Sequence, residues 1–265
     1  TRVLEERTLV KIPKPGPAEL PLVMPVWAKE VAVDGPPGTY RLLVTFEKGA
    51  AATGGQTEFF VADPSAGAAP TGEIVLWGDD PAMRKWLTDR GVRVRGLDEK
   101  ASPAGEVILA GPRPPQPAGP AFEQLRKRIE RGATAIFLCP EVFRQDKDPV
   151  AYLPLEPKGR LAHMGSWVYL KDEWAKRHPI FDGLPCGGVL DLAFYREIIP
   201  DRVLAGQSPP AQAVAGAINA SQAYSSGLMV AVYRLGSGRI VLNTLRIRDN
   251  LGAHPAADRL LANMI

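Results

Sequence analysis

The feature that most constrains this chain is a change of pattern on either side of a short linker. Residues 62–71, Ala-Asp-Pro-Ser-Ala-Gly-Ala-Ala-Pro-Thr, are small or polar and include two prolines, as is typical of a linker between folded units. Before the linker, apolar segments are separated by turns rich in proline and glycine; after it, short apolar strands alternate with amphipathic helices. We therefore expect two units, residues 1–64 and residues 72–265.

The first unit has the pattern of an all-β structure. Its four candidate strands carry β-branched and aromatic residues between turns, at Val3–Ile12, Leu20–Val33, Gly38–Phe46 and Thr57–Val61. Tyr40, Leu42 and Val44 share one face of the third strand, because side chains along a strand repeat with a period of two. An immunoglobulin-like sandwich usually has about seven strands, so we expect a small Ig-like β-sandwich piece that is incomplete or leans on the second unit.

In the second unit, strands and helices alternate in the order that builds a parallel sheet. The expected strands are Glu73–Trp77, Val92–Val94, Glu106–Ala110 and Thr134–Cys139, with helices from Pro81 to Gly91 and over Ala121–Arg131. Asp80 is placed to cap the first helix, with Pro81 at its first position. Because right-handed crossovers place helices on both faces of such a sheet, we expect a three-layer α/β domain.

Beyond Glu141 the pattern is looser. We expect strands at Trp167–Leu170 and Leu192–Ile199, a hairpin of Leu228–Leu235 and Arg239–Ile247 around Gly236-Ser237-Gly238, and a final helix over Pro255–Ile265. The hairpin is the clearest of these elements, because a glycine-rich turn between two apolar runs favours a tight reversal of the chain.

In open α/β sheets, ligands bind beyond the carboxyl ends of the strands. The residues predicted to lie there are Trp77, Asp79 and Asp80 after the first strand, Arg113 after the third, and Cys139 and Glu141 after the fourth. For the two aspartates, helix capping is the simpler explanation. Neither GxGxxG nor GxxxxGK followed by Ser or Thr occurs, so no nucleotide or other cofactor is expected.

Cys139 is the most suggestive single residue, because it ends a buried strand where a nucleophile elbow would turn into a helix. An elbow needs small neighbours, whereas Leu138 and Pro140 flank this cysteine and the proline removes a backbone donor. A buried structural thiol is therefore the favoured interpretation. The chain has three histidines, at positions 163, 178 and 254, and their spacing marks neither a metal site nor a catalytic triad. We predict no catalytic residue and no metal site.

Charge and hydropathy argue against two classes of partner. The net charge is +3, from 32 basic and 29 acidic side chains that are interspersed, so we expect no nucleic acid partner. The longest apolar runs are far shorter than the ~20 residues of a membrane-spanning helix, so we expect no membrane partner. Aromatic residues such as Trp167 and Tyr224 leave a glycan as a possible ligand.

Several segments resemble the C-terminal part of β-galactosidase-like glycoside hydrolases of family 2. They are His178-Pro179-Ile180-Phe181-Asp182-Gly183-Leu184-Pro185, Phe194-Tyr195, Ile198-Ile199-Pro200, Gly238–Asn243, Ala257–Asn263 and, in the first unit, Pro37–Leu42. The resemblance implies an Ig-like piece followed by a flavodoxin-like, class I glutamine-amidotransferase-like domain. It also implies that the glycosidase carboxylates lie on a TIM barrel of ~250 residues outside this chain.

The motifs of working amidotransferases are broken here. Such enzymes carry Gly-x-Cys-x-Gly and a later His-x-Glu, whereas this chain has Leu138-Cys139-Pro140 and His254-Pro255-Ala256. The leading hypothesis is an accessory region that supports the catalytic domain of the same polypeptide, mediates homo-oligomerisation or shapes the substrate cleft, in a parent that is secreted or periplasmic. The alternatives are a carbohydrate-binding module and a stand-alone hydrolase or amidotransferase that uses Cys139.

Overall fold

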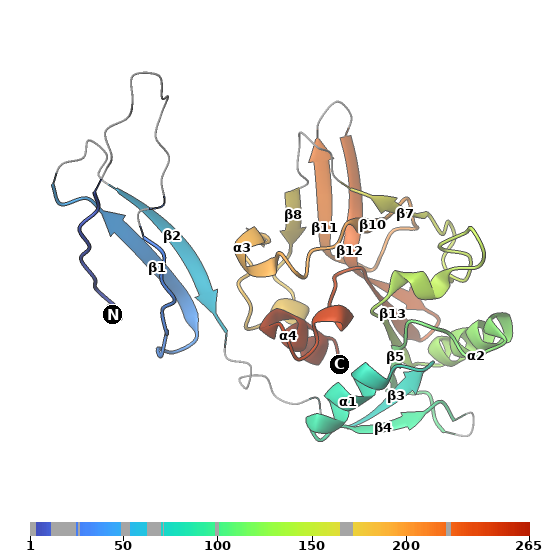
Figure 1. The fold of residues 1–265 in the computed structure, drawn as a ribbon. Coiled ribbons are helices and arrows are strands. Elements are labelled where there is room, and N and C mark those ends of the chain that lie inside the picture. The colour runs from blue at the N-terminus through green and yellow to red at the C-terminus, as the bar shows by residue number, and fades with distance from the viewer. Residues whose placement is uncertain are drawn as a thin grey trace.

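The computed structural model describes residues 4–11, 25, 27–48, 54–62, 70, 72–98, 101–164, 172–220 and 224–265. Two sheets occur in this part of the chain: a two-stranded sheet near the N-terminus and a large mixed sheet that contains all the other strands (Figure 1). None of the helices in these ranges combines the length and apolar character that crossing a membrane requires.

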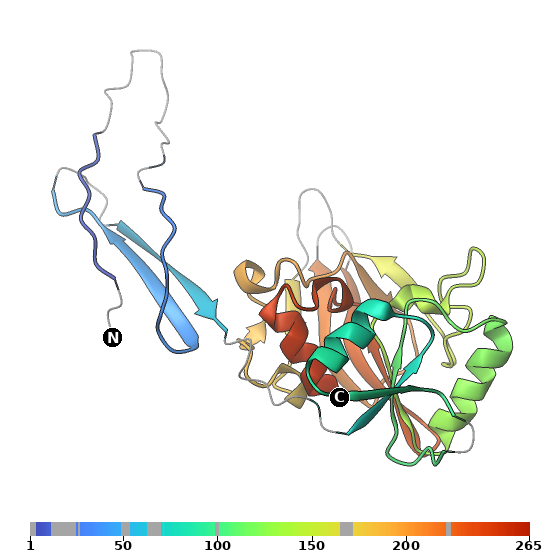
Figure 2. The same ribbon diagram turned by 60° about the horizontal axis from the view of Figure 1, so that its bottom comes forward.

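The N-terminal sheet is an antiparallel hairpin of β1 (Gly38–Thr45) and β2 (Gly54–Val61). Tyr40 and Phe59 lie opposite each other on one face, and their rings stack with centroids 5.7 Å apart. Both strands were predicted, as Gly38–Phe46 and Thr57–Val61, from β-branched and aromatic residues between turns. The hairpin projects away from the large sheet (Figures 1 and 2).

The two strands predicted before this hairpin are wrong wherever they are described. Residues 4–11, 25 and 27–33 form no strand, and the rest of Val3–Ile12 and Leu20–Val33 lies outside the described residues. The described parts meet through side chains, as in the Lys29–Glu6 ion pair of 2.8 Å, and not through a backbone ladder. The small Ig-like β-sandwich piece over residues 1–64 therefore stays a prediction.

The large sheet joins a parallel half to an antiparallel half. Its parallel strands, in spatial order, are β4 (Arg93–Gly96), β3 (Glu73–Trp77), β5 (Val107–Ala110), β6 (Thr134–Phe137) and β13 (Gly238–Asn243). The antiparallel strands β12 (Tyr224–Leu235), β11 (Gln212–Ala220), β8 (Asp172–Ala175) and β9 (Gly188–Val189) continue from β13. Off this path, β10 (Arg202–Ala205) pairs with β12 and with β7 (Arg160–His163).

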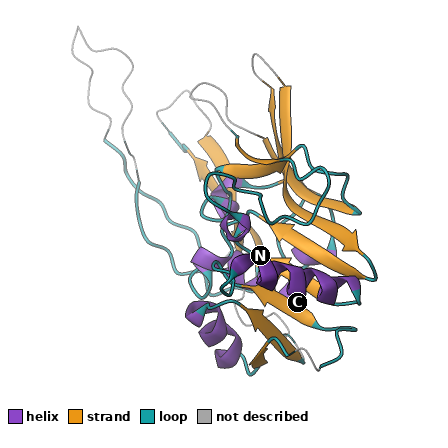
Figure 3. Ribbon diagram, turned by 90° about the vertical axis from the view of Figure 1, so that its right-hand side faces the viewer, coloured by secondary structure: helices purple, strands orange, loops and turns teal. Residues whose placement is uncertain are grey.

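Helices cover both faces of the parallel half. Helices α1 (Pro81–Asp89) and α4 (Pro255–Met264) lie side by side on one face, where Trp86 Nε1 donates to Asp258 Oδ1 at 2.6 Å (Figure 2). Helix α2 (Ala118–Glu130) packs on the other face and contributes to a second apolar cluster. The strands of the antiparallel half extend beyond these helices (Figure 3). The predicted alternation of strands and helices is found in the parallel half, but the sheet as a whole is mixed and not parallel as predicted.

One prediction in the looser C-terminal region is wrong. Leu192–Ile199 is not a strand: it begins with the short helix α3 (Leu192–Tyr195), because Asp191 Oδ1 accepts a hydrogen bond from Ala193 N at 2.8 Å and starts a helical turn. Tyr195 is completely buried, and its hydroxyl donates to Pro185 O at 2.9 Å. The other predicted strand, Trp167–Leu170, lies outside the described residues.

A buried ion-pair network lies at the amino end of the parallel strands. Glu106 is 8% exposed and accepts hydrogen bonds from Arg128 Nη2 at 2.9 Å and from Arg95 Nη2 at 2.6 Å. Burial alone would raise the pKa of Glu106, but its hydrogen bonds with Arg128 and Arg95 outweigh burial and hold the pKa below its usual value. The network ties α2 to the sheet.

The turn between β12 and β13 packs tightly on the end of α2. A Cβ on Gly238 would lie 2.0 Å from Ile129 O, and Ser237 N donates to Glu130 O at 2.9 Å. The glycine predicted from the hairpin pattern is therefore also needed for the close approach of two backbones.

Candidate functional site

The switch point of the sheet lies between β3 and β5, because the chain passes from β3 to β4 on one side and to β5 on the other. Backbone packing closes this point. Gly111 N donates to Trp77 O at 2.8 Å, and a Cβ on Gly78, whose φ is +85°, would lie 2.2 Å from Arg113 O. The place where a ligand crevice was expected is therefore filled by the two loops themselves.

Three predicted site residues in or next to these two loops differ in burial. Trp77 is 2% exposed, and its ring packs edge-on against Phe122 of α2 with centroids 4.8 Å apart. Its Nε1 has no hydrogen-bond partner among the described residues. Asp79 and Arg113 are exposed to solvent. Trp77 is thus part of the core of the α2 face, and the other two are on the surface.

Asp80 is a structural anchor. Its Oδ1 accepts from Met83 N at 3.1 Å, so the predicted helix cap is confirmed. Its carboxylate also forms a two-point ion pair with Arg248, from Nε to Oδ2 at 2.6 Å and from Nη2 to Oδ1 at 3.2 Å. The Asp80 side chain is fully buried, so both oxygens of the carboxylate are committed.

Cys139 lies beside this pair, at the end of β6. Burial raises the pKa of its thiol to about 12, although the nearby charge of Arg248 acts in the opposite direction. The backbone at Cys139 is extended, with φ −128° and ψ 106°, and Pro140 starts the short 3₁₀ helix η1 (Pro140–Phe143) directly after it. The strained turn of a nucleophile elbow is absent at this residue, and the thiol is protonated at neutral pH.

A cavity of about 230 Å³ opens between Cys139 and the segment that follows β13. It is lined by Leu138, Cys139, Pro140, Glu141, Pro200, Asp201, Arg202, Thr244, Leu245, Arg246, Arg248 and Asp249. The structure thus brings the predicted residues Cys139 and Glu141 together with Arg248, and connects Asp80 to them through its ion pair. None of the residues lining this cavity is a histidine.

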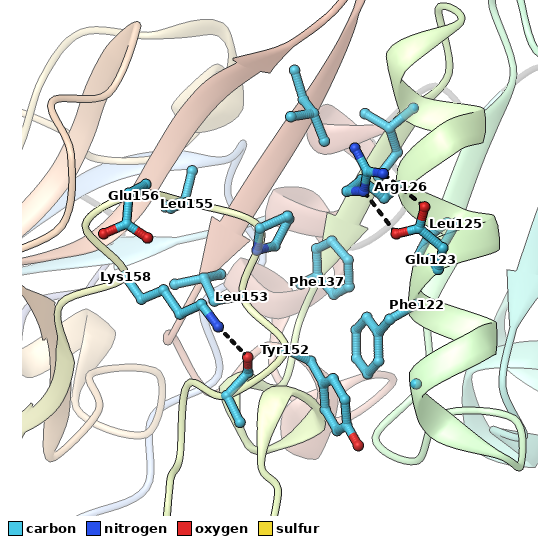
Figure 4. Close-up of a pocket in the computed structure, with 15 residues that line it drawn as sticks. Phe122, Glu123, Leu125, Arg126, Phe137, Tyr152, Leu153, Leu155, Glu156 and Lys158 are labelled. Atoms are coloured by element: carbon cyan, nitrogen blue, oxygen red, sulfur yellow. Dashed lines mark hydrogen bonds and ion pairs between the residues drawn. The ribbon is translucent and has the colours of Figure 1, made fainter.

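A larger cavity of about 460 Å³ lies on the opposite face, between α2 and residues 151–158 (Figure 4). Its walls are mainly apolar, and Tyr152 stacks on Phe122 with ring centroids 4.7 Å apart. Two cations at its edge are already engaged: Arg126 Nη2 lies 2.7 Å from Glu123 Oε1, and Lys158 Nζ donates to a backbone carbonyl. None of the predicted site residues lines it.

Two of the segments that carry the family resemblance, residues 178–185 and 257–263, meet in space. His178 caps the short helix η2 (Pro179–Phe181), since its Nδ1 accepts from Ile180 N at 3.2 Å. From α4, Asn263 Nδ2 donates to Ile180 O at 3.0 Å and to Asp182 O at 2.9 Å. These motifs therefore hold the C-terminal helix against a loop.

Comparisons with known proteins give only weak likenesses. No family model and no curated protein sequence matches the chain. An exo-β-1,4-mannosidase from Opitutaceae bacterium strain TAV5 matches 73% of this chain with TM-score 0.40 and 12% identity. A cytoplasmic protein from Salmonella typhimurium matches 85% with TM-score 0.42 and 11% identity, and a β-galactosidase from Rahnella sp. R3 matches 72% with TM-score 0.37 and 11% identity.

The matched region spans 35% of the mannosidase chain, 30% of the β-galactosidase chain and 94% of the Salmonella protein. Likenesses at this level transfer neither a fold nor an activity to this chain. Within the described residues, no group of three or more His, Cys, Asp or Glu side chains is arranged to hold a metal ion.

The sequence prediction missed the far wall of the Cys139 cavity. Arg202 and Arg248 come from the looser part of the chain, and Arg248 follows a strand that was predicted only as half of a hairpin. That strand, β13, runs parallel to β6, so its carboxyl end reaches the same edge of the sheet as Cys139. Recognising β13 as a parallel strand would have placed Arg248 there.

Proposed function

We propose that this chain is an accessory module of a multidomain glycoside hydrolase and does not itself perform the hydrolysis. The sequence resemblance to family 2 enzymes supports the choice of enzyme class. The strand order β4-β3-β5-β6-β13 supports a flavodoxin-like, amidotransferase-like domain, because numbering these strands along the chain gives the order 2-1-3-4-5.

The observation that carries the proposal is the two-point pair between Asp80 and Arg248. It occupies the edge of the sheet where an enzyme of this fold class would place its reacting groups. Asp80 is committed to a helix cap and to an arginine, and Arg248 is the cation that could otherwise stabilise a Cys139 thiolate. Groups that could serve catalysis thus serve packing.

The N-terminal hairpin supports a role in docking. A two-stranded hairpin on its own is only marginally stable in water, and here Phe60 of β2 packs edge-on against Phe194 of α3 with ring centroids 5.3 Å apart. Leu42 and Val44 lie on the same face as the Tyr40–Phe59 pair, and they are 38% and 42% exposed. Burial of this face against the catalytic domain of the same polypeptide would remove apolar surface from water and stabilise the hairpin. A second copy of this chain is the competing occupant.

The direct test is enzymatic. The purified chain should hydrolyse nitrophenyl β-D-galactoside and β-D-mannoside no faster than a buffer blank. Turnover above the blank would overturn the accessory role, provided that it is retained through a second purification step.

A second test asks whether the face binds a second copy. Light scattering compares the wild-type chain with Leu42→Asp, and Leu43→Asp on the opposite face is the matched control.

A further inference from the structure

The cavity beside Cys139 has two walls and a floor from three different segments. Glu141 belongs to the wall that follows β6, and Arg202 belongs to the wall formed by residues 200–202. The segment after β13 lies between them, because β13 pairs with β6 on one side and Arg246 N donates to Ile198 O at 2.8 Å on the other. Glu141 and Arg202 therefore belong to opposite walls.

The charges around the cavity are balanced. Three arginines and three carboxylates line it, and most are already paired: Arg246 with Asp201 at 2.7 Å, and Arg248 with Asp80 and Asp249. Glu141 and Arg202 are exposed, and neither forms an ion pair with another described residue. The cavity thus offers one free acceptor and one free donor, without an excess of either charge.

The floor is partly apolar and partly polar. Leu138 and Leu245 are buried there, and the Thr244 hydroxyl has no hydrogen-bond partner among the described residues. An anionic or a cationic ligand would meet a like charge on one wall, whereas a hydroxyl group can donate to a carboxylate and accept from a guanidinium. At about 230 Å³ the cavity is smaller than the ~300 Å³ typical of drug-sized ligands, which suits one small ring.

We propose that this cavity binds a single neutral sugar residue, with Glu141 accepting and Arg202 donating hydrogen bonds to its hydroxyl groups. The choice of a sugar among small neutral polyols rests on the proposed function. The site holds the ligand without chemistry, since Cys139 is protonated and the carboxylate of Asp80 is occupied.

The test measures ligand binding to the whole chain by saturation-transfer difference NMR and by titration. Methyl β-D-galactoside and methyl α-D-mannoside are the neutral probes, with glucuronate, glucosamine and alanine as charged comparators. At least one neutral sugar should bind, and Glu141→Gln and Arg202→Gln should each weaken binding roughly tenfold. Asp89→Asn and Arg131→Gln, exposed charges outside the cavity, should leave binding unchanged.

Three results would overturn the site: no binding of either neutral sugar, preference for a charged comparator, or binding that is insensitive to Glu141→Gln and Arg202→Gln. Circular dichroism of these two variants checks that they fold, and both positions are exposed. The two proposals fail separately. Hydrolysis by the chain would overturn the accessory role and leave sugar binding standing, whereas absence of sugar binding would leave the accessory role standing.

Discussion

Arg248 holds Asp80 across 168 positions of sequence, with its Nε 2.6 Å from Oδ2 and its Nη2 3.2 Å from Oδ1. The pair joins the N-terminus of α1 to the segment that follows the last strand, so the first and last parts of the α/β domain meet at one carboxylate. Both the cap of α1 and the ion pair with Arg248 therefore depend on the Asp80 carboxylate.

Removal of this carboxylate should destabilise the domain. We expect Asp80→Ala to lower the free energy of unfolding by about 2–3 kcal/mol, since it removes a cap and leaves Arg248 without its partner. Asp80→Asn keeps an acceptor for Met83 N and should lose less. Urea unfolding monitored by tryptophan fluorescence measures both. Asp79→Ala, at an exposed neighbouring position, should change stability by less than about 0.5 kcal/mol.

Glu106 should make stability depend on pH. Its pKa is held below the usual 4.5, so its contribution is fully present above pH 4.5 and is lost as the pH falls through the lowered pKa. Glu106→Gln should cost about 3 kcal/mol at pH 7, because it leaves the buried Arg128 without a charged partner. In urea titrations, the free energies of unfolding of the wild type and of Glu106→Gln should become more similar as the pH falls below 4.5.

An exposed glutamate of α2 provides the control for that experiment. Glu123 pairs with Arg126 at the surface, so Glu123→Gln should change stability by less than about 1 kcal/mol. If Glu123→Gln and Glu106→Gln show equal losses at pH 7, the buried network does not stabilise the fold in the way described.

Cys139 should react slowly with thiol reagents. A pKa raised from 9.0 to about 12 lowers the thiolate fraction near neutral pH roughly a thousandfold. We expect Cys186→Ser, which retains only Cys139, to be labelled by iodoacetamide far more slowly when folded than in urea. Labelling of the folded protein at the rate of the unfolded one would instead support a cysteine-dependent enzyme.

The raised pKa of Cys139 also predicts that the folded domain loses stability at alkaline pH. Because the folded-state pKa of Cys139 is raised, its contribution to stability is intact below pH 9 and is lost as the pH rises toward about 12. Cys139→Ala should remove this contribution to the loss of stability at alkaline pH. Cys186→Ala changes a less buried thiol and should reduce the loss of stability by a smaller amount.

Gly78 should tolerate no side chain. Its φ of +85° is unfavourable for other residues, and a Cβ would lie 2.2 Å from Arg113 O, a backbone atom that cannot move aside alone. We expect Gly78→Ala to lower the free energy of unfolding by about 2 kcal/mol or more. Gly119 lies in α2 with nothing near its Cβ position, so Gly119→Ala should stabilise by about 0.5–1 kcal/mol.

The parallel half of the sheet could be predicted because its signals are local. Glu73–Trp77 is a short apolar run bounded by turns, and Asp80-Pro81 is a recognisable helix start. β11 could not be predicted, because its sequence Gln-Ala-Val-Ala-Gly-Ala-Ile-Asn-Ala lacks the large residues typical of a strand. The structure explains the small residues: a Cβ on Gly216 would lie 2.5 Å from the Trp174 ring.

The candidate site was also predictable only where its residues follow a strand with a local sequence signal. Cys139 and Glu141 follow a strand that local pattern identifies, so their position at the carboxyl edge could be expected. Arg202 and Arg248 reach that edge only through long-range pairing of β10 and β13, which no local signal encodes. The closure of the switch point by Gly78 and Arg113 is likewise a contact between two loops that sequence spacing does not specify.

The position of β13 has a consequence for how the protein is made. This strand lies between β6 and β12 at the centre of the sheet, yet about 100 residues separate it from β6 in the chain. During synthesis, β3 to β6 therefore leave the ribosome before β12 and β13. The edge of β6 that later pairs with β13 stays unpaired until β13 has been synthesised. Until then that edge can pair with other chains, so we expect folding intermediates on the ribosome to depend on chaperones more than the finished protein does.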